Sequence, residues 1–159
     1  MSTQRTDRVL NAYRIGDPDG RHDIYDDEGS QLYPGRWNTR NSPVVYCSEH
    51  YSTAMLEKLV HANGVMPPNR HYITITIPNG ISFERFSGAA HPGWSGQSED
   101  ICKEYGEAWV LEQRSAILLV PSIPARVETN ILINLAHEES SKITYELTSP
   151  IWWDERLFG

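Results

Sequence analysis

The stretch from His71 to Ile77 constrains the fold of this chain most strongly. Its isoleucines alternate with more polar residues at a period of two, and the turn sequence Pro-Asn-Gly follows at 78–80. Such alternation is typical of a strand that buries one face and leaves the other partly exposed. A second stretch, residues 114–122, is almost continuously apolar and indicates a strand buried inside a sheet.

Shorter apolar stretches predict further strands, and two amphipathic stretches predict helices. We expect strands over 9–15 and 43–47, a short strand or turn over 81–86, a strand or loop over 128–134, and one more strand over 143–153. One helix is expected to begin near residue 53 and another to span 101–113, whereas 21–32 look like an exposed acidic loop. The sequence therefore predicts an α+β fold, a single domain over residues 1–159 with short mixed strands and two or three helices.

Length and charge exclude several classes of protein. The chain has 159 residues, enough for one domain with a real core, and no run of eighteen apolar residues that could span a membrane. Its first residues lack the apolar segment of a secretory signal. Cys47 and Cys102 lack the spacing of a metal or redox pair, so free buried thiols and a cytoplasmic location are expected. A net charge of −7 disfavours direct nucleic-acid binding, because phosphate neutralisation requires clustered cations.

The stretch Tyr33-Pro-Gly-Arg-Trp-Asn38 is a candidate binding turn. Pro34 and Gly35 form a tight turn, and Gly35 lacks the side chain that would keep a ligand away from the backbone. Arg36 presents a planar fork of donors that suits diphosphate oxygens. Taken alone, the pattern favours a structural turn with a surface arginine, so its interpretation depends on neighbouring features.

Two of these neighbouring features are Arg14 and Tyr46. Arg14 lies among apolar residues in the first expected strand, so it requires either a ligand or a partner in an ion pair at the edge of the core. Tyr46 follows the β-branched Val44 and Val45 in the expected strand 43–47 and can offer an aromatic face.

The third neighbouring feature is a carboxylate on the first expected helix. Glu57 falls near the edge of an apolar stripe, although Glu57 and Lys58 equally fit a plain surface pair. The residues of the stripe are Ala54, Leu56, Leu59 and Val60. A cation, an aromatic face and a single carboxylate in one short part of the chain suggest a site for a phosphate-bearing ligand with a ring.

The short motifs of this sequence, taken in their order along the chain, resemble those of the RES domain, the toxin half of RES–Xre toxin–antitoxin modules. The resemblance covers nearly the whole chain, with a motif-bearing core over about residues 9–153. The motifs are Tyr13-Arg14, Gly35-Arg36-Trp37-Asn38, Val45-Tyr46 with Ser48, Ala54-x-x-Glu57, Ser115 before Leu-Leu-Val-Pro-Ser122, and Asn130-x-x-x-Asn134-x-x-His137.

The resemblance implies a fold similar to that of ADP-ribosyltransferases and an enzyme that takes NAD⁺ as substrate. Members split the nicotinamide–ribose bond by hydrolysis or phosphorolysis, so phosphate is a candidate co-substrate and no separate cofactor is expected. The sequence contains no Gly-x-Gly-x-x-Gly, so a Rossmann mode of binding NAD⁺ is not expected. The implied partner is an Xre-type helix-turn-helix antitoxin, which forms a hetero-oligomer with the toxin, covers its pocket and makes the DNA contact.

The resemblance also implies roles for single residues. Glu57, Arg36 and Tyr46 match catalytic positions, with Glu57 stabilising positive charge on the ribose. The residues expected to bind NAD⁺ are Tyr13, Arg14, Gly35, Arg36, Tyr46, Glu57 and Ser115. Ser115 is assigned as the family serine because it begins the strand expected to face the pocket, and Ser122 is the alternative.

Three other functions fit parts of the pattern. A protein ADP-ribosyltransferase would use the same arginines, tyrosine and glutamate, so the sequence does not separate it from an NAD⁺ glycohydrolase or phosphorylase. A non-catalytic binding module of the same fold would have no need of all these residues. A metal-dependent hydrolase is disfavoured, because the histidines form no His-x-x-x-His pair with an adjacent glutamate, and no metal is expected.

Overall fold

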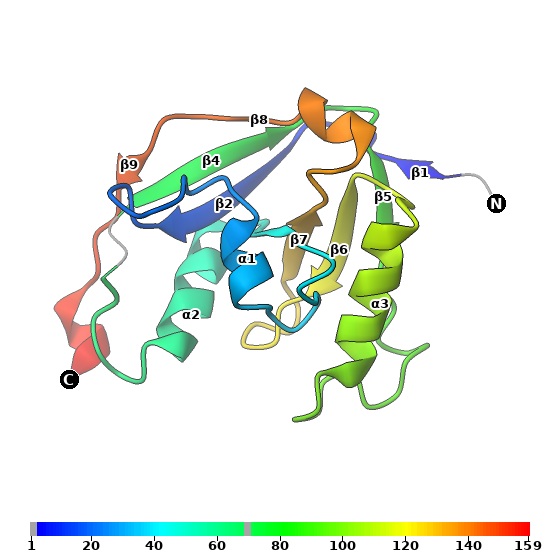
Figure 1. The fold of residues 1–159 in the computed structure, drawn as a ribbon. Helices are drawn as coiled ribbons and strands as arrows, with labels where there is room; N and C mark the ends of the chain where they lie inside the picture. Colours follow the sequence, from blue (N-terminus) through cyan, green and yellow to red (C-terminus); the bar gives the residue numbers. More distant parts are fainter. Residues whose placement is uncertain (1–2, 69–70) are drawn as a thin grey trace.

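The computed structural model describes residues 3–68 and 71–159, and within them it contains a nine-stranded sheet and three α-helices (Figure 1). The strands are β1 (Gln4–Arg5), β2 (Leu10–Gly16), β3 (Val45–Ser48), β4 (His71–Ile77), β5 (Ser82–Arg85), β6 (Ile117–Pro121), β7 (Thr129–Ile133), β8 (Thr144–Tyr145) and β9 (Ser149–Pro150). The helices are α1 (Glu28–Leu32), α2 (Tyr51–His61) and α3 (Asp100–Leu111), with 3-10 helices at Glu138–Lys142 and Glu155–Phe158. The predicted α+β fold is confirmed.

The sheet is nearly divided between β2 and β3. Its order is β1-β5-β6-β7-β3-β2-β4-β8, with β9 also paired to β4, and every pairing except that of β5 with β6 is antiparallel. β2 pairs with β4 along its full length, from Leu10 to Gly16, whereas β2 and β3 share the single register pair Tyr13–Ser48. The two halves of the sheet therefore separate beside β3, and the candidate site lies there.

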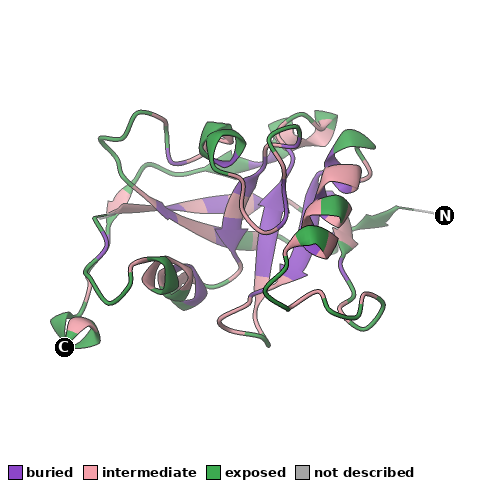
Figure 2. Ribbon diagram, turned by 60° about the horizontal axis from the view of Figure 1, so that its bottom comes forward, coloured by how far each residue is buried: buried purple, intermediate pink, exposed green. Residues whose placement is uncertain are grey.

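The apolar patterns of the sequence are explained by which faces of the strands are buried. Ile73, Ile75 and Ile77 of β4 are all buried on one face, as the alternation predicts. β6 is buried on both faces, because Ile117 packs into one core cluster and Leu118 packs into the other, under α3. Figure 2 shows this central part of the sheet as the most buried part of the molecule.

Helix α3 fixes the turn at residues 33–38. A Cβ atom at Gly106 would lie 1.6 Å from the carbonyl oxygen of Trp37, so only glycine allows the helix to lie this close to the turn. Trp37 is 4% exposed, and the Lys103 ammonium donates a hydrogen bond to the carbonyl of Gly35. The candidate binding turn is therefore anchored on the helix side and has limited freedom to move.

Several predicted boundaries are wrong. Residues 21–32 are not simply an exposed loop, because α1 forms there and Ser30 is buried, with its hydroxyl donating to the carbonyl of Val44 at 2.7 Å. The expected strand at 143–153 is two short strands, β8 and β9. Helix α2 begins at Tyr51, two residues before the expected start.

Two expectations about composition can be compared with the structure. Cys47 and Cys102 are both free and buried, as predicted. Among the described helices, none is long and apolar enough to cross a membrane.

Candidate functional site

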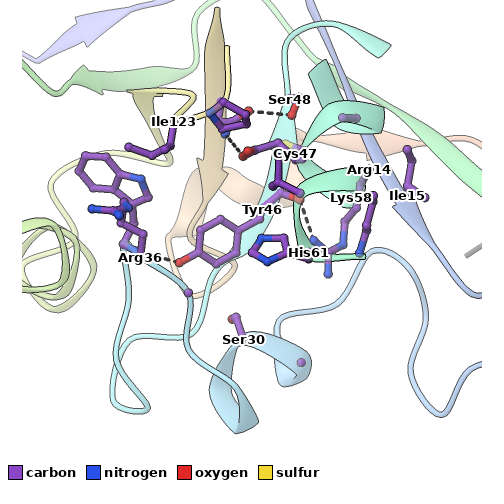
Figure 3. Close-up of a pocket in the computed structure, with 18 of the residues that line it drawn as sticks. Arg14, Ile15, Ser30, Arg36, Tyr46, Cys47, Ser48, Lys58, His61 and Ile123 are labelled. Carbon is purple, nitrogen blue, oxygen red and sulfur yellow. Dashed lines mark hydrogen bonds between the residues drawn. The ribbon is translucent and has the colours of Figure 1, made fainter. Parts of the chain in front are cut away.

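A cavity of about 600 Å³ lies where β2 and β3 diverge (Figure 3). Its walls come from β2, the α1 segment with the turn that follows it, β3, α2, the loop after β6, and β7. This volume is in the range of pockets that bind small molecules and cofactors. Six of the seven residues predicted to bind NAD⁺ line it: Tyr13, Arg14, Gly35, Arg36, Tyr46 and Glu57.

Glu57 is held in the cavity by a two-step hydrogen-bond relay. The Asn130 side-chain amide donates to a Glu57 carboxylate oxygen at 2.6 Å, and the Ser48 hydroxyl donates to the Asn130 side-chain oxygen at 2.7 Å. The register of β3 with β7 sets Ser48 directly opposite Asn130, which places both side chains on one face of the sheet. α2 follows β3 after a short loop and brings Glu57 over this pair.

Opposing effects act on the pKa of the Glu57 carboxyl. Burial raises the pKa of the Glu57 carboxyl above its ordinary value, and the Asn130 hydrogen bond and the charge of His61 oppose this rise. A carboxylate that is partly desolvated but still hydrogen-bonded interacts more strongly with a nearby positive charge than one in water.

Arg14 is fixed by backbone groups instead of by an acid. Its Nε donates to the carbonyl of Ile24 at 2.6 Å, and one terminal nitrogen donates to the carbonyl of Tyr46 at 2.7 Å. Within the described residues Arg14 forms no ion pair, so the alternative of an ion pair at the core edge is not what the structure shows. Burial lowers the pKa of the Arg14 guanidinium. Arg14 lines the cavity, and among the described residues its remaining N–H groups have no other acceptor.

Tyr46 is packed against the turn, and this contact explains Gly35. The Tyr46 hydroxyl donates to the Asn38 side-chain oxygen at 2.6 Å and accepts from the Trp37 backbone N–H at 3.1 Å. A Cβ atom at Gly35 would lie 2.8 Å from that hydroxyl oxygen. The expected close approach at Gly35 is therefore an approach to the tyrosine ring, which it holds at the cavity wall.

Replacing Gly35 with alanine is expected to lower the free energy of unfolding by about 1–3 kcal/mol, because the new methyl group must displace a hydrogen-bonded and largely buried ring. Chemical denaturation measures this change. Gly29→Ala is the matched control, since nothing lies within 4 Å of its Cβ position in α1 and alanine favours a helix. Equal stability of the two variants would contradict the packing argument.

Arg36 lines the cavity, but both terminal nitrogens of its guanidinium already donate hydrogen bonds to the protein. One terminal nitrogen donates to the carbonyls of Trp94 at 3.0 Å and Gly96 at 3.3 Å, and the other donates to Gly96 at 3.3 Å. Glu99 lies 3.9 Å away as a weak ion-pair partner. Arg36 thus connects the binding turn to the loop before α3, and its free donors are fewer than the sequence pattern suggests.

Ser115 does not reach the cavity, so the expectation that it faces the pocket is wrong. β6 begins only at Ile117, and Ser115 is buried, with its hydroxyl accepting from the Trp109 indole at 2.8 Å and donating to the carbonyl of Ile117 at 2.7 Å. The alternative, Ser122, is also buried and accepts from the backbone N–H of Ala125 at 3.2 Å. Neither serine lines the cavity, whereas Ser48 does.

Sequence reasoning missed three residues of the site as functional groups. Asn130 was visible as a polar residue inside the apolar stretch 129–133, where it needs a partner. Lys58 follows buried Ala54 by four residues and therefore shares its helix face, so it is not part of a plain surface pair with Glu57. His61 lines the cavity one turn after Glu57.

Comparisons with known proteins agree with this architecture. Residues 11–154 match the RES domain family. The chain is 34% identical over 134 residues to a Prs ADP-ribosylating toxin from Sphingobium sp. (strain YBL2), covering 81% of this chain and 83% of that protein. It is 30% identical over 108 residues to Toxin Res from Photorhabdus laumondii subsp. laumondii, covering 67% of this chain and 69% of that protein.

A solved structure shares the fold. The crystal structure of the M. tuberculosis MbcT–MbcA toxin–antitoxin complex contains a chain that matches with a TM-score of 0.73 at 16% identity, over 92% of this chain and 86% of that chain. Because the family match spans most of the sequence and a relative at 34% identity covers four fifths of it, this chain belongs to the RES domain family.

Proposed function

We propose that this chain is a toxin that consumes NAD⁺ by breaking its nicotinamide–ribose bond. The observation that carries the proposal is one cavity in which a relay-held carboxylate, Glu57, shares space with the partly buried cation Arg14 and the aromatic side chain of Tyr46. A dinucleotide with a pyridinium ring and a diphosphate needs these three kinds of group.

The chemistry of the bond explains why one carboxylate is enough. Departure of nicotinamide builds positive charge on the ribose C1′, in a state similar to that of glycoside cleavage. An ionised Glu57 stabilises this charge more than the ground state, which is the condition for accelerating the step. The leaving group departs as a neutral base, so no second acid is required. In this proposal Arg14 binds phosphate oxygens and Tyr46 contacts a ring of the substrate.

The acceptor of the ADP-ribose group defines two versions of the function. Water or phosphate as acceptor makes the chain a glycohydrolase or a phosphorylase, as the family resemblance implies. A protein as acceptor is the second candidate, and it is favoured by the 34% identity with a Prs ADP-ribosylating toxin. The same Glu57 and Arg14 serve both versions, because the bond broken is the same.

We further propose that an antitoxin of the Xre type covers the mouth of this cavity. The structural neighbour is part of a toxin–antitoxin complex, and two apolar residues that line the cavity, Tyr33 and Val60, are 83% and 50% exposed. Exposed apolar groups at the rim of a cavity are typical of a protein-binding surface. Co-expression with a cognate helix-turn-helix antitoxin should then abolish growth inhibition.

The deciding experiment incubates the purified chain with NAD⁺, with and without phosphate, and resolves the products. Release of nicotinamide with free ADP-ribose is expected for a glycohydrolase, and a phosphorylated ADP-ribose that forms only with phosphate is expected for a phosphorylase. Labelled ADP-ribose attached to a protein in cell extract would establish the transferase version. Intact NAD⁺ in every reaction would overturn the proposed function.

A further inference from the structure

The cavity contains a second cation that lacks a counter-charge. Lys58 lies on α2 and lines the same cavity as Arg14 (Figure 3). Within the described residues, the Lys58 ammonium has no hydrogen-bond acceptor and no ion-pair partner. The neighbouring carboxylate, Glu57, is engaged by Asn130 instead.

Arg14 and Lys58 line the same cavity, and neither has an ion-pair partner among the described residues. Placing two such cations in one cavity lowers the stability of the fold. Burial, together with the positive charge of Arg14, lowers the pKa of the Lys58 ammonium to about 8. Water and hydrogen bonds offset only part of the cost of a desolvated charge. An arrangement that opposes stability and yet lies in a cavity is a candidate for ligand binding.

The other cations near the cavity do not share this property. Arg36 donates to the carbonyls of Trp94 and Gly96, and Lys103 donates to the carbonyl of Gly35 and pairs with Glu99 at 3.4 Å. Their charges are therefore largely satisfied by the protein. Of the described arginines and lysines that line the cavity, those without an acidic partner are Arg14 and Lys58, whereas Arg36, which was also expected to hold phosphate oxygens, is largely occupied by protein carbonyls.

We infer that Lys58 and Arg14 together form the anion-binding corner of the cavity and take the phosphate oxygens of the substrate or of a phosphate co-substrate. The guanidinium, held by the carbonyls of Ile24 and Tyr46, supplies fixed donors, and the flexible ammonium closes on the anion from α2. The assignment to the NAD⁺ diphosphate rests on the proposed function, whereas the anion site itself does not. Lys58 is thus a specificity-determining residue in addition to those predicted from sequence.

The test is Lys58→Met, which keeps much of the side-chain volume and removes the charge. We expect ADP-ribose to bind about ten- to hundred-fold more weakly to the variant, in line with loss of a charge-assisted hydrogen bond. Nicotinamide riboside, which carries no phosphate, should bind both proteins equally. The matched control is Lys142→Met, which removes an exposed lysine from the end of the Glu138–Lys142 helix.

Thermal unfolding distinguishes a binding role from a structural one. Removing an unpaired, partly buried cation should leave the melting temperature of Lys58→Met unchanged or raise it, while a structural lysine would lower it on removal. In turnover assays with NAD⁺, the variant should show a raised KM with a smaller change in kcat. Weaker binding together with a large loss of stability would overturn the assignment.

The source of the anion is resolved by separate titrations. Competition of inorganic phosphate with ADP-ribose, lost in Lys58→Met, would place a free phosphate in the same corner. If Lys58→Met weakens the binding of phosphate but not that of ADP-ribose, then Arg14 and Lys58 bind a phosphate co-substrate and not the diphosphate of NAD⁺. Equal affinity of the wild type and Lys58→Met for both ligands would overturn the inference.

The pH dependence of binding provides an independent readout. Because Lys58 has a pKa of about 8, the affinity of the free protein for ADP-ribose should fall as the pH rises through 8–9, and this step should be absent from Lys58→Met. The other titratable groups around it are Arg14, Tyr46, Cys47, Glu57 and His61. Burial raises the pKa of Tyr46 and raises that of Cys47 to about 12, and that of Glu57 starts from the acidic range, so none of these three accounts for a step at pH 8–9.

These measurements separate the two proposals. Absence of NAD⁺ turnover with any acceptor would remove the proposed function, but the ADP-ribose and phosphate titrations would still decide on Lys58. Conversely, normal turnover together with normal affinity for both ADP-ribose and phosphate in Lys58→Met would remove the inference and leave the proposed function in place.

Discussion

Glu57→Gln is expected to lower the rate of NAD⁺ consumption by about 10²–10³-fold or more, because it removes the one negative charge placed to stabilise a developing positive charge on the ribose. The amide keeps the shape of the side chain and can still accept the 2.6 Å hydrogen bond from Asn130. Release of nicotinamide, measured by chromatography at saturating NAD⁺, gives the change in kcat directly.

The same substitution should not destabilise the protein. The pKa of Glu57 is higher in the folded state than in the unfolded state. Ionisation of Glu57 therefore lowers the free energy of unfolding as the pH rises through this pKa, and the loss remains at neutral pH. Glutamine removes this loss, and the melting temperature at pH 7 should stay constant or rise. Glu146→Gln, at an exposed position between β8 and β9, controls for the change in net charge. Full turnover in Glu57→Gln would overturn the assignment of the carboxylate.

The sequence predicts the strands better than it predicts their partners. The alternation in β4 and the continuous apolar run of β6 depend on local burial, which the residue pattern records. The near-division of the sheet between β2 and β3 depends on pairing between distant segments, which no local pattern records. Since the cavity lies at that division, its position could be predicted only through the family resemblance.

The error at Ser115 has a simple geometric cause. β6 does approach the cavity, but it does so at Pro121, the end of the strand far from Ser115. Six residues of extended chain span about 20 Å, so the two ends of one strand belong to different parts of the molecule. Recognising a strand that faces a pocket does not indicate which of its ends lines it.

Helix α2 shows a different limit of pattern reading. Its apolar residues Leu56 and Val60 were expected on the buried stripe, yet they are 36% and 50% exposed. The face that points to the sheet carries buried Ala54, as predicted, together with buried Thr53 and the cavity residues Glu57 and Lys58. Because this face also lines the cavity, it carries charged residues beside Ala54, and the apolar pattern predicts only part of it.

Asn130→Asp is expected to lower kcat/KM at neutral pH by about ten- to hundred-fold, because two carboxyl groups within hydrogen-bond distance do not both ionise readily. In the wild type, activity should fall as the pH drops through the raised pKa of Glu57. In the variant, Glu57 and the new carboxyl group at position 130 should share a proton. The acidic limb of the pH–rate profile should therefore move to higher pH, by about one pH unit or more. Initial rates across a pH series measure both effects.

The shape of that profile decides how Asn130 acts. If its only role were to support β7 against β3, the substitution would lower activity and stability at every pH without moving the acidic limb. If it tunes Glu57, activity should recover at higher pH, where the second carboxyl ionises. Asn79→Asp, at an exposed turn after β4, adds the same charge far from the site and should leave the profile unchanged. A limb that stays in place in Asn130→Asp would show that the relay from Ser48 through Asn130 positions the carboxylate without controlling its proton.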